Sequence, residues 1–423
     1  MSSIITNSAR SPFSKGYQRQ RKFQSILSEA AGLFNWQGSR ATTLTDIANS
    51  MKLTKTCVYY YVKTKEDLIY QCYVSSCDMW LAQAQQAAAL EGNGLEKIVA
   101  MVQGHFDQYV KALNGVAPHF AMLAEISSLD EAHAADIKNR WQEVFDLCKK
   151  MVSQGIEEGV IENLDPAVIC TGIFAIPQWF PVWLKRSHAT NPEPIIKAVL
   201  DILVNGLSQQ HHEFSDIEFP EPSNLSLDSF DRGFQNRLKR EAFYRVGTTQ
   251  FNQKGFKGTS LDEIASLLDV TKGAFYYHIK NKEELLYQCF NRTLTVEKNL
   301  LTAAGTVEVT GLKKVELSLR YLFNVQFTDQ GPLIRYRSLP SLDEEHRKKI
   351  LKVTKTNSGK LGAYIRQGFD DSTLRKIDAD VAQHVLSGAV EASANLAEWV
   401  ADANAPELSA SYFHLFINGL SAK

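Results

Sequence analysis

The stretch LTDIANSMKLTKTCVYYYVKTKEDLIYQCY, residues 44–73, decides the fold, because the chain repeats it as LDEIASLLDVTKGAFYYHIKNKEELLYQCF at residues 261–290. The two stretches align without a gap at an offset of 217 residues, and 14 of the 30 positions are identical. Identity at this density over an ungapped block indicates an internal duplication. The chain of 423 residues is also long for one hydrophobic core and suits two units of about 200 residues.

The duplication extends beyond the quoted stretches. The same register aligns Phe34, Asn35, Gly38 and Thr42 with Phe251, Asn252, Gly255 and Thr259. A weaker similarity at offset 213 aligns Asn205-Gly206-Leu207 with Asn418-Gly419-Leu420. Each unit therefore has a similar head and a similar end, and the Glu-, Asp-, Pro- and Ser-rich segment between the units is typical of a linker. The predicted boundaries are 15–73 (first head), 74–207 (first body), 208–230 (linker), 231–290 (second head) and 291–423 (second body).

Each head is predicted to contain four helices. Apolar residues recur at helical spacing until Gly38, which is expected to end the first helix. Ser260 with Glu263 predicts a full capping box, and Thr43 with Asp46 resembles one. The third helix is short and follows the second after a tight turn, so the pair predicts a helix-turn-helix whose third helix reads DNA. The expected N-caps of the last three helices are Thr43, Thr54 and Thr64 in the first head, and Ser260, Thr271 and Asn281 in the second.

These residues resemble the head of the TetR family of repressors. The resemblance rests on residues 43–48, 53–55 and 59–68, and it is closer in the second copy at residues 270–273 and 276–285. It implies an all-α fold of two tandem TetR-like units, each with a helix-turn-helix head and a helical-bundle body for ligand binding and dimerisation. Both copies depart from the family pattern, because the usual turn glycine is Lys52 in one and Asp269 in the other, and Thr56 replaces a further glycine.

Candidate DNA-binding residues follow from the helix-turn-helix geometry, in which the start of the third helix meets base edges and its neighbours contact phosphates. Lysines at the start of the fourth helix are expected to contact phosphate, and the tyrosine pairs can donate hydrogen bonds to the DNA backbone. One tyrosine of each pair could instead pack in the core, and Thr43 and Ser260 could act as caps. The candidates are Thr43, Thr54, Lys55, Tyr59, Tyr60 and Lys65 in the first head, and Ser260, Thr271, Lys272, Tyr276, Tyr277 and Lys282 in the second.

Charge is distributed unevenly along the chain. The net charge is only −1, but residues 10–73 carry +6, residues 232–290 carry +4, and the remainder carries −11. Basic heads on acidic bodies suit phosphate binding, although a solvated charged face would give the same pattern. The partner predicted from the heads and this charge pattern is double-stranded operator DNA.

The tandem arrangement predicts that one chain replaces the homodimer of its relatives. We expect the two bodies to pack as an intramolecular pseudo-dimer, tethered by residues 208–230. The third helices differ between the copies, at residues 56–58 and 273–275, so the operator is expected to be an imperfect palindrome. The alternative is a homodimer of whole chains with four heads, which sizing in solution would distinguish.

The bodies are rich in aromatic residues, most of which plain core packing would explain. The family resemblance implies a pocket for an inducer, and the aromatic lining suggests a small hydrophobic or amphipathic molecule such as an acyl thioester. The candidate ligand-binding residues are Phe106, Trp141, Trp179, Phe180 and Trp183. No cofactor is expected.

Other classes of protein find little support in the sequence. We expect a cytoplasmic location, because residues 1–14 lack the apolar stretch of a secretory signal, and no membrane span, because Pro177 and Pro181 interrupt the short apolar run 168–184. The chain has no nucleophile elbow, phosphate-binding loop or HExxH spacing, which argues against an enzyme. His211 and His212 are interpreted as part of a solvated loop and not as metal ligands. A helical adaptor whose heads have lost DNA affinity is the remaining alternative.

Overall fold

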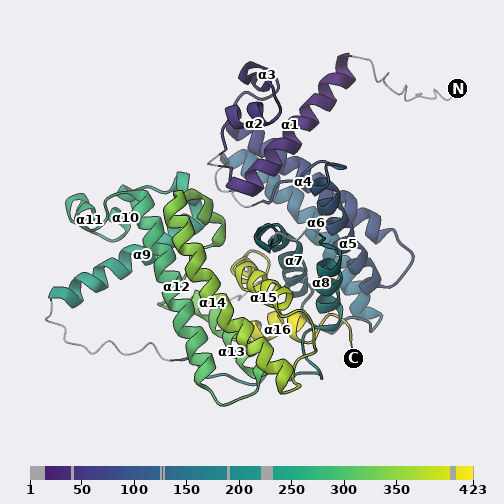
Figure 1. Ribbon diagram of the computed structural model, residues 1–423, viewed down its shortest axis with the longest axis vertical. Coiled ribbons are helices and arrows are strands. Elements are labelled where there is room, and N and C mark those ends of the chain that lie inside the picture. Colours follow the sequence, from purple (N-terminus) through teal and green to yellow (C-terminus); the bar gives the residue numbers. More distant parts are fainter. Residues whose placement is uncertain are drawn as a thin grey trace.

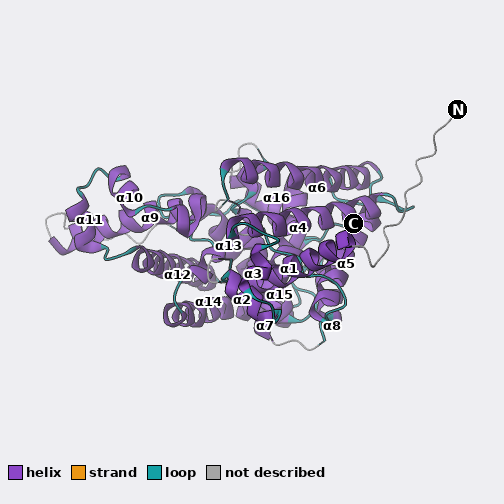
Figure 2. Cartoon of the chain, turned by 90° about the horizontal axis from the view of Figure 1, so that it is seen from above, coloured by secondary structure: helices purple, strands orange, loops and turns teal. Residues whose placement is uncertain are grey.

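The structure is a computed structural model that describes residues 15–39, 42–123, 126, 129–187, 191–220, 232–400 and 406–422. Helices make up both units, and these residues form no strand, only two isolated bridges (Figures 1 and 2). The predicted all-α class of two tandem units is confirmed. Residues 1–14, where no secretory signal was found, and the second half of the expected linker, residues 221–230, lie outside the described residues.

The first unit contains eight α-helices. They are α1 (Lys15–Gln37), α2 (Leu44–Ser50), α3 (Lys55–Tyr59), α4 (Lys65–Ala88), α5 (Gly94–Leu113), α6 (Glu131–Glu157), α7 (Pro166–Ser187) and α8 (Glu193–Asn205). In its described residues the second unit repeats this order of α-helices and also forms three short 3-10 helices. It contains α9 (Arg232–Gly258), α10 (Leu261–Leu267), α11 (Lys272–His278), α12 (Lys282–Thr306), α13 (Gly311–Asn324), η2 (Val325–Phe327), η3 (Tyr336–Ser341), α14 (Glu344–Asp370), α15 (Ala379–Ser393), η4 (Leu396–Glu398) and α16 (Pro406–Ile417).

A glycine ends the first helix of each head. Gly38 follows α1 with φ 85°, and its counterpart Gly255 interrupts α9 with φ 67°, a left-handed conformation that favours glycine. The hydroxyl of Thr42 donates to the carbonyl of Gly38 at 2.8 Å, and that of Thr259 donates to Gly255 at 2.7 Å. The expected end of the first helix is therefore confirmed, and the turn after it is built alike in both copies.

The capping boxes differ from the prediction. Thr43 and Asp46 form the complete box, in which each side chain accepts a hydrogen bond from the other residue's backbone N–H. In the second head, Ser260 accepts from the N–H of Glu263 at 3.4 Å, but the Glu263 carboxylate binds Lys254 instead of returning to Ser260. The full box expected in the second copy was therefore wrong, because a lysine there occupies the position that Gln37 has in the first.

Helix α7 continues through both of its prolines. The expectation that Pro177 and Pro181 break this segment was wrong, since α7 runs from Pro166 to Ser187. By length and composition alone, residues 166–184 could cross a membrane, but 83% of that apolar window is buried inside the protein. The two prolines lie four residues apart, and therefore on one face of the helix. Helix α7 is a core helix that packs against the second unit.

The two units contact each other mainly through α7 and α8 of the first and α15 and α16 of the second, which we name the interunit seam (Figure 1). Small residues allow close approach here, since a Cβ on Gly388 would lie 2.7 Å from Trp179 and one on Gly172 would lie 2.5 Å from Leu415. The rings of Trp183 and His384 stack across the seam at 4.6 Å. The hydrophobic core is therefore continuous from one body to the other.

The ends of the two units cross in a twofold manner at the seam. The N–H of Leu207 donates to the carbonyl of Phe416 at 3.1 Å, and the N–H of Leu420 donates to the carbonyl of Leu203 at 2.9 Å. The second bond is the first one shifted by 213 residues and seen from the other unit. The isolated bridges obey the same rule, because Ile161 pairs with Ser421 and Ser208 pairs with Leu374. The two copies thus meet at equivalent backbone positions.

The described part of the expected linker lies on the second unit as a loop up to Pro220. His212 Nε2 lies 2.8 Å from the buried Glu316 carboxylate, and the Arg320 guanidinium donates to the carbonyl of Ser215 at 2.6 Å. The ring of Phe219 contacts that of Tyr321. These contacts hold the described part of the linker against the first third of the second body.

We predict that Gly206→Ala and Gly419→Ala each destabilise the protein by about 2 kcal/mol or more. Both glycines have positive φ, 69° and 90°, and a Cβ on either one would lie 2.4 to 2.6 Å from backbone atoms of the other unit. The free energy of unfolding from denaturant titration measures the effect. Gly359→Ala is the matched control: it lies in α14 with open space around it, so it should be neutral or slightly stabilising. Equal effects at all three sites would contradict the crossing.

Candidate nucleic-acid interface and interunit cavity

The two expected reading helices begin at the predicted caps. The Thr54 hydroxyl accepts from the N–H of Cys57 at 3.3 Å, and the Thr271 hydroxyl accepts from the N–H of Ala274 at 3.2 Å. Both caps are exposed, as are Thr43 and Ser260 at the starts of α2 and α10. Helices α3 and α11 project away from the bodies (Figure 1). The sequence therefore placed the helix starts correctly, and the hydroxyls of these four residues act as caps in this structure.

The rings of the two predicted tyrosine pairs, one pair in each head, face solvent. Tyr59 and Tyr60 are 46% and 65% exposed, and Tyr276 and Tyr277 are 44% and 84% exposed. The residue before each tyrosine pair is buried instead: Val58 in the first head and Phe275 in the second have no exposed surface. The alternative prediction, that one tyrosine ring of each pair packs in the core, was therefore wrong. Large exposed aromatic rings at matched positions are a feature of binding surfaces.

The lysines at the starts of the reading helices have different surroundings. Lys272 Nζ lies 2.6 Å from the Asp262 carboxylate, which also accepts from the Tyr276 hydroxyl at 3.3 Å. The hydrogen bond from Lys272 lowers the pKa of Asp262, so this carboxylate is charged at neutral pH. In the first head Thr45 replaces that aspartate, and Lys55 lies 5.6 Å over the Tyr59 ring. The reading lysine of the second head is thus ion-paired with a carboxylate, whereas that of the first head lies over an aromatic ring.

The two lysines expected to meet phosphate at the start of the fourth helix are half-buried. Lys282 donates to the carbonyl of Thr259 at 2.9 Å and lies 4.8 Å over the Phe256 ring. Its ammonium therefore binds the end of α9, the first helix of the second head. Lys65 has the equivalent position in α4 and also lies partly below the surface. A phosphate contact by Lys282 requires its side chain to leave these partners.

The turn between α2 and α3, and its copy between α10 and α11, adopts a left-handed conformation without glycine. Lys52 has φ 54° and Asp269 has φ 51°. The family resemblance places a glycine at this position, and the geometry explains that preference because a side chain with a Cβ is strained there. Aspartate tolerates this conformation better than lysine does, so the first head carries more strain than the second.

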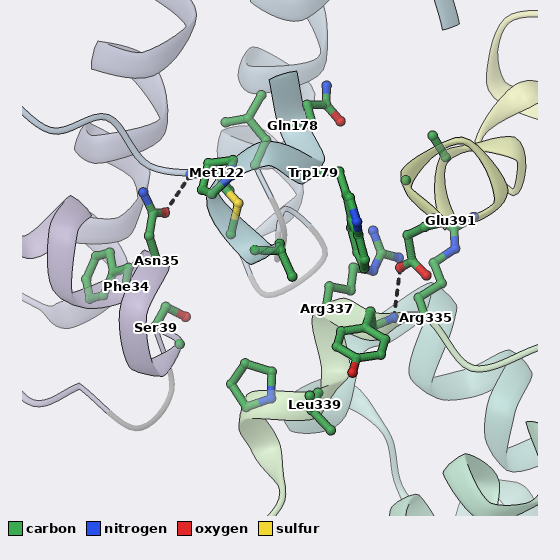
Figure 3. A pocket seen from close by; sticks show the side chains of 18 of the residues that line it. Phe34, Asn35, Ser39, Met122, Gln178, Trp179, Arg335, Arg337, Leu339 and Glu391 are labelled. Carbon is green, nitrogen blue, oxygen red and sulfur yellow. Dashed lines mark hydrogen bonds between the residues drawn. The ribbon is translucent and has the colours of Figure 1, made fainter. Parts of the chain in front are cut away.

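The aromatic residues expected to bind ligand do not form one site. Phe106, Phe180 and Trp183 are buried in the core, at most 4% exposed. Trp141 borders a hollow of about 20 Å³, with room for little more than one water molecule. Of the five candidates only Trp179 lines the large cavity, whose volume is about 600 Å³ (Figure 3). That volume lies in the usual range for small-molecule sites.

This interunit cavity lies between the end of α1, the loop after α5, helix α7, the segment 335–340 and helix α15 (Figure 3). Both units therefore contribute to its wall. The sequence reasoning missed its polar residues Arg335, Arg337 and Glu391. The one available signal was the basic triplet Arg335-Tyr336-Arg337, which is unusual in an acidic body but has no counterpart in the first unit to draw attention to it.

Matched asparagines join each head to its body beside this cavity. Asn35 accepts from the N–H of Met122 at 2.9 Å and donates to the carbonyl of Phe120 at 2.6 Å. Asn252 accepts from the N–H of Arg335 at 3.0 Å and donates to the carbonyl of Leu333 at 2.9 Å. We name these bonds the amide clamps. Each clamp fixes the first helix of a head to the segment that follows α5 or α13, so both head–body joints reach the cavity.

Of the two linker histidines expected in a solvated loop, His211 is exposed in a loop, but His212 is half-buried against Glu316. His212 binds Glu316, and His211 lies with Glu162 and His414 in a group whose ligand atoms are all within 4.8 Å of one another. Imidazole and carboxylate groups are ligands for zinc, so this group could hold a divalent metal ion after a small contraction. The residues come from the α6–α7 loop, the linker and α16, which is why spacing in the sequence did not connect them.

Comparison with known proteins gives consistent matches. The profile of bacterial regulatory proteins of the tetR family matches residues 26–72 and 244–289, and the tetracyclin repressor-like C-terminal domain matches residues 91–207. The Transposon Tn10 TetC protein of Escherichia coli is 30% identical over 146 residues, which cover 33% of this chain and 69% of that protein. The HTH-type transcriptional repressor KstR2 of Mycolicibacterium smegmatis is 24% identical over 190 residues, covering 44% of this chain and 89% of that protein.

Among solved structures, AibR in complex with isovaleryl coenzyme A and operator DNA is similar at 22% identity, with a TM-score of 0.37. The match covers 43% of this chain and 97% of that chain. The ketosteroid transcriptional regulator KstR2 of Mycobacterium tuberculosis matches with a TM-score of 0.37 at 20% identity, covering 43% of this chain and 92% of that chain.

We predict that Lys52→Gly stabilises the first head by about 0.5–1 kcal/mol, because glycine removes the cost of the left-handed conformation but adds chain entropy to the unfolded state. Asp269→Gly should gain less. Hydrogen exchange of the α2–α3 amides measures the effect. Lys52→Ala is the matched control, since it removes the same charge and keeps the Cβ. If alanine stabilised as much as glycine, charge and not backbone strain would be responsible.

Proposed function

We propose that a single chain of this protein binds one operator with both of its heads. The proposal follows because the chain belongs to the TetR family and is a DNA-binding transcriptional regulator. In each head the start of the reading helix would enter the major groove, while the tyrosines and lysines around it contact the DNA backbone. The residues are those predicted from the sequence, with Lys55 as the freer of the two reading lysines.

The observation that carries this proposal is the exposure of four tyrosine rings at matched positions beside two capped, projecting helices. Tyr277, at 84% exposed, makes almost no contact within the protein. Phenolic hydroxyls donate to phosphate oxygens, and such contacts set the register of a protein on the duplex. The four rings would therefore orient the two heads, and residues at the starts of α3 and α11 would select the bases.

The interunit seam supports the view that the chain acts as its own dimer. Backbone bonds cross the seam at equivalent positions of the two units, and a continuous core lies beneath them. The reading helices differ, with Thr56-Cys57 in one and Gly273-Ala274 in the other, so the two half-sites are proposed to differ as well. The operator would be an imperfect palindrome with a fixed orientation.

Repression is the proposed outcome of binding, with release by a small hydrophobic or amphipathic molecule such as an acyl thioester. KstR2 is named a transcriptional repressor, and IcaR of Staphylococcus epidermidis is named a negative transcriptional regulator. The interunit cavity supports the ligand, because it has a suitable volume and reaches both amide clamps. The protein would act in the cytoplasm, where its DNA lies.

The test is to select bound fragments from the source genome and to measure the mass of the resulting complex. One chain of 47.4 kDa per operator supports the proposal, and two chains per operator overturn it. The affinity should fall steeply as salt increases, because several phosphate contacts release counterions. Absent binding, or binding that salt does not weaken, would favour the helical adaptor.

We predict that Asp262→Asn strengthens operator binding, because it frees Lys272 and removes a negative charge from the DNA-facing surface. The slope of log affinity against log salt should become steeper by about 1, the effect of one added phosphate contact. Thr45→Asp is the reciprocal change in the first head, and it should weaken binding and make the slope shallower by a similar amount. Gel-shift titrations over a salt series measure both. Unchanged slopes for both variants would place these residues away from the DNA.

A further inference from the structure

The interunit cavity has an excess of positive charge at one end. Arg335, Arg337 and Arg347 line it together with a single carboxylate, Glu391 (Figure 3). Glu391 is engaged with the protein, since it accepts from the N–H of Tyr336 at 2.8 Å. Burial and the neighbouring Arg335 lower the pKa of Arg337 to about 10, so this guanidinium still carries its charge at neutral pH. Three guanidinium groups against one carboxylate in a partly enclosed cavity favour an anionic ligand.

Two hydrogen-bond donors at this end have no acceptor among the described residues. They are the indole N–H of Trp179 and the Nε–H of Arg335, and both are buried. The other end of the Arg335 guanidinium is fixed, because it donates to the Asn395 side chain at 2.6 Å and to the carbonyl of Ala394 at 2.7 Å. A buried donor without an acceptor is unfavourable, because it has lost its hydrogen bond to water. A ligand that supplies oxygen atoms here would replace that bond.

The rest of the cavity is apolar. Side chains of the first head, the first body and the segment before α14 line it: Phe34, Met122, Leu123, Val182, Leu339 and Pro340. Such a wall binds hydrocarbon through the removal of apolar surface from water. Charge at one end and apolar surface over the remainder define a ligand with the same two parts.

We propose that the interunit cavity binds one amphipathic acid per chain, with its acid group on Arg335, Arg337 and the Trp179 indole N–H, and its hydrocarbon tail along the apolar wall. This inference rests on the proposed function, whose ligand it specifies. Met122 and Gln178, which correspond in the first unit to Arg335 and Glu391, line the same cavity, so the described residues of the two units form one shared site whose charges come from the second unit. One chain therefore takes one molecule and not two.

The site contacts the joints of both heads, which is how its occupancy would reach the DNA. Phe34 and Gly38 of the first head form part of the wall, and a Cβ on Gly38 would lie 2.5 Å from Pro340. Arg337 donates to the backbone carbonyl of Asn252, the clamp residue of the second head. A ligand that draws Arg337 toward its acid group and fills the space beside Phe34 changes both joints together.

The test is calorimetric titration of the full chain with decanoic acid and with 1-decanol, both below the concentration at which they aggregate. The acid should bind in a one-to-one ratio and at least tenfold more tightly than the alcohol. Trp179→Phe keeps an aromatic ring in the wall but removes the N–H, and should weaken acid binding roughly tenfold. Arg335→Gln should abolish it. Glu391→Gln should tighten it, because it removes the competing carboxylate and keeps the acceptor for Tyr336, a gain that a purely structural role would not produce.

Arg366→Gln is the matched control, since Arg366 lies exposed on α14 outside the cavity and its loss should leave acid binding unchanged. Equal affinity for acid and alcohol, or no tightening with Glu391→Gln, would overturn the acid assignment. Decanoyl-coenzyme A forms a separate arm: it should bind no better than decanoic acid, and much tighter binding would place the anionic group outside this cavity. If the chain does not bind operator DNA even without acid, the proposed function is refuted but the acid site is not, because calorimetry measures the acid site independently of DNA.

Discussion

The structure depends on the close crossing of two backbone segments, where the end of each unit passes against the end of the other. Gly206 and Gly419 approach so closely that neither can carry a side chain, and the bonds from Leu207 and Leu420 join the units at this point. Helices α7, α8, α15 and α16 pack around the crossing. Both heads are therefore positioned relative to the same backbone junction. Because the core around this junction is closely packed, a change on one side of the seam is transmitted to the other side.

The two copies share the parts that hold a head together and the exposed tyrosine pairs, but they differ around the reading lysines. The caps of the reading helices, the glycines after α1 and within α9, and the asparagines of the amide clamps recur in both units. The surroundings of the reading lysines do not recur, since Thr45 in one head corresponds to Asp262 in the other. The residues that hold a head together are thus different side chains from those proposed to select bases.

Local rules predicted the heads well. Capping hydroxyls and glycine at helix ends act over three or four residues, so the order of letters contains them, and Thr54, Thr271 and Gly38 lie where expected. The same rules failed where a distant partner competes. The Glu263 carboxylate binds Lys254 and so does not complete its capping box. Helix α7 packs against the second unit and remains helical through its two prolines. The cavity was out of reach for a related reason: its arginines, its tryptophan and its clamp residues come from five segments that only the folded chain brings together.

The seam also has a consequence for how such a regulator behaves when it is scarce. A protein that must pair before it can bind loses active species with the square of its concentration on dilution, whereas two units on one chain assemble in a first-order step that dilution does not reverse. On the proposed function, in which one chain fills one operator, very few copies of this chain would suffice to hold a gene silent. Random partition of those copies at division would change how many molecules a daughter inherits, but every molecule inherited would already be complete.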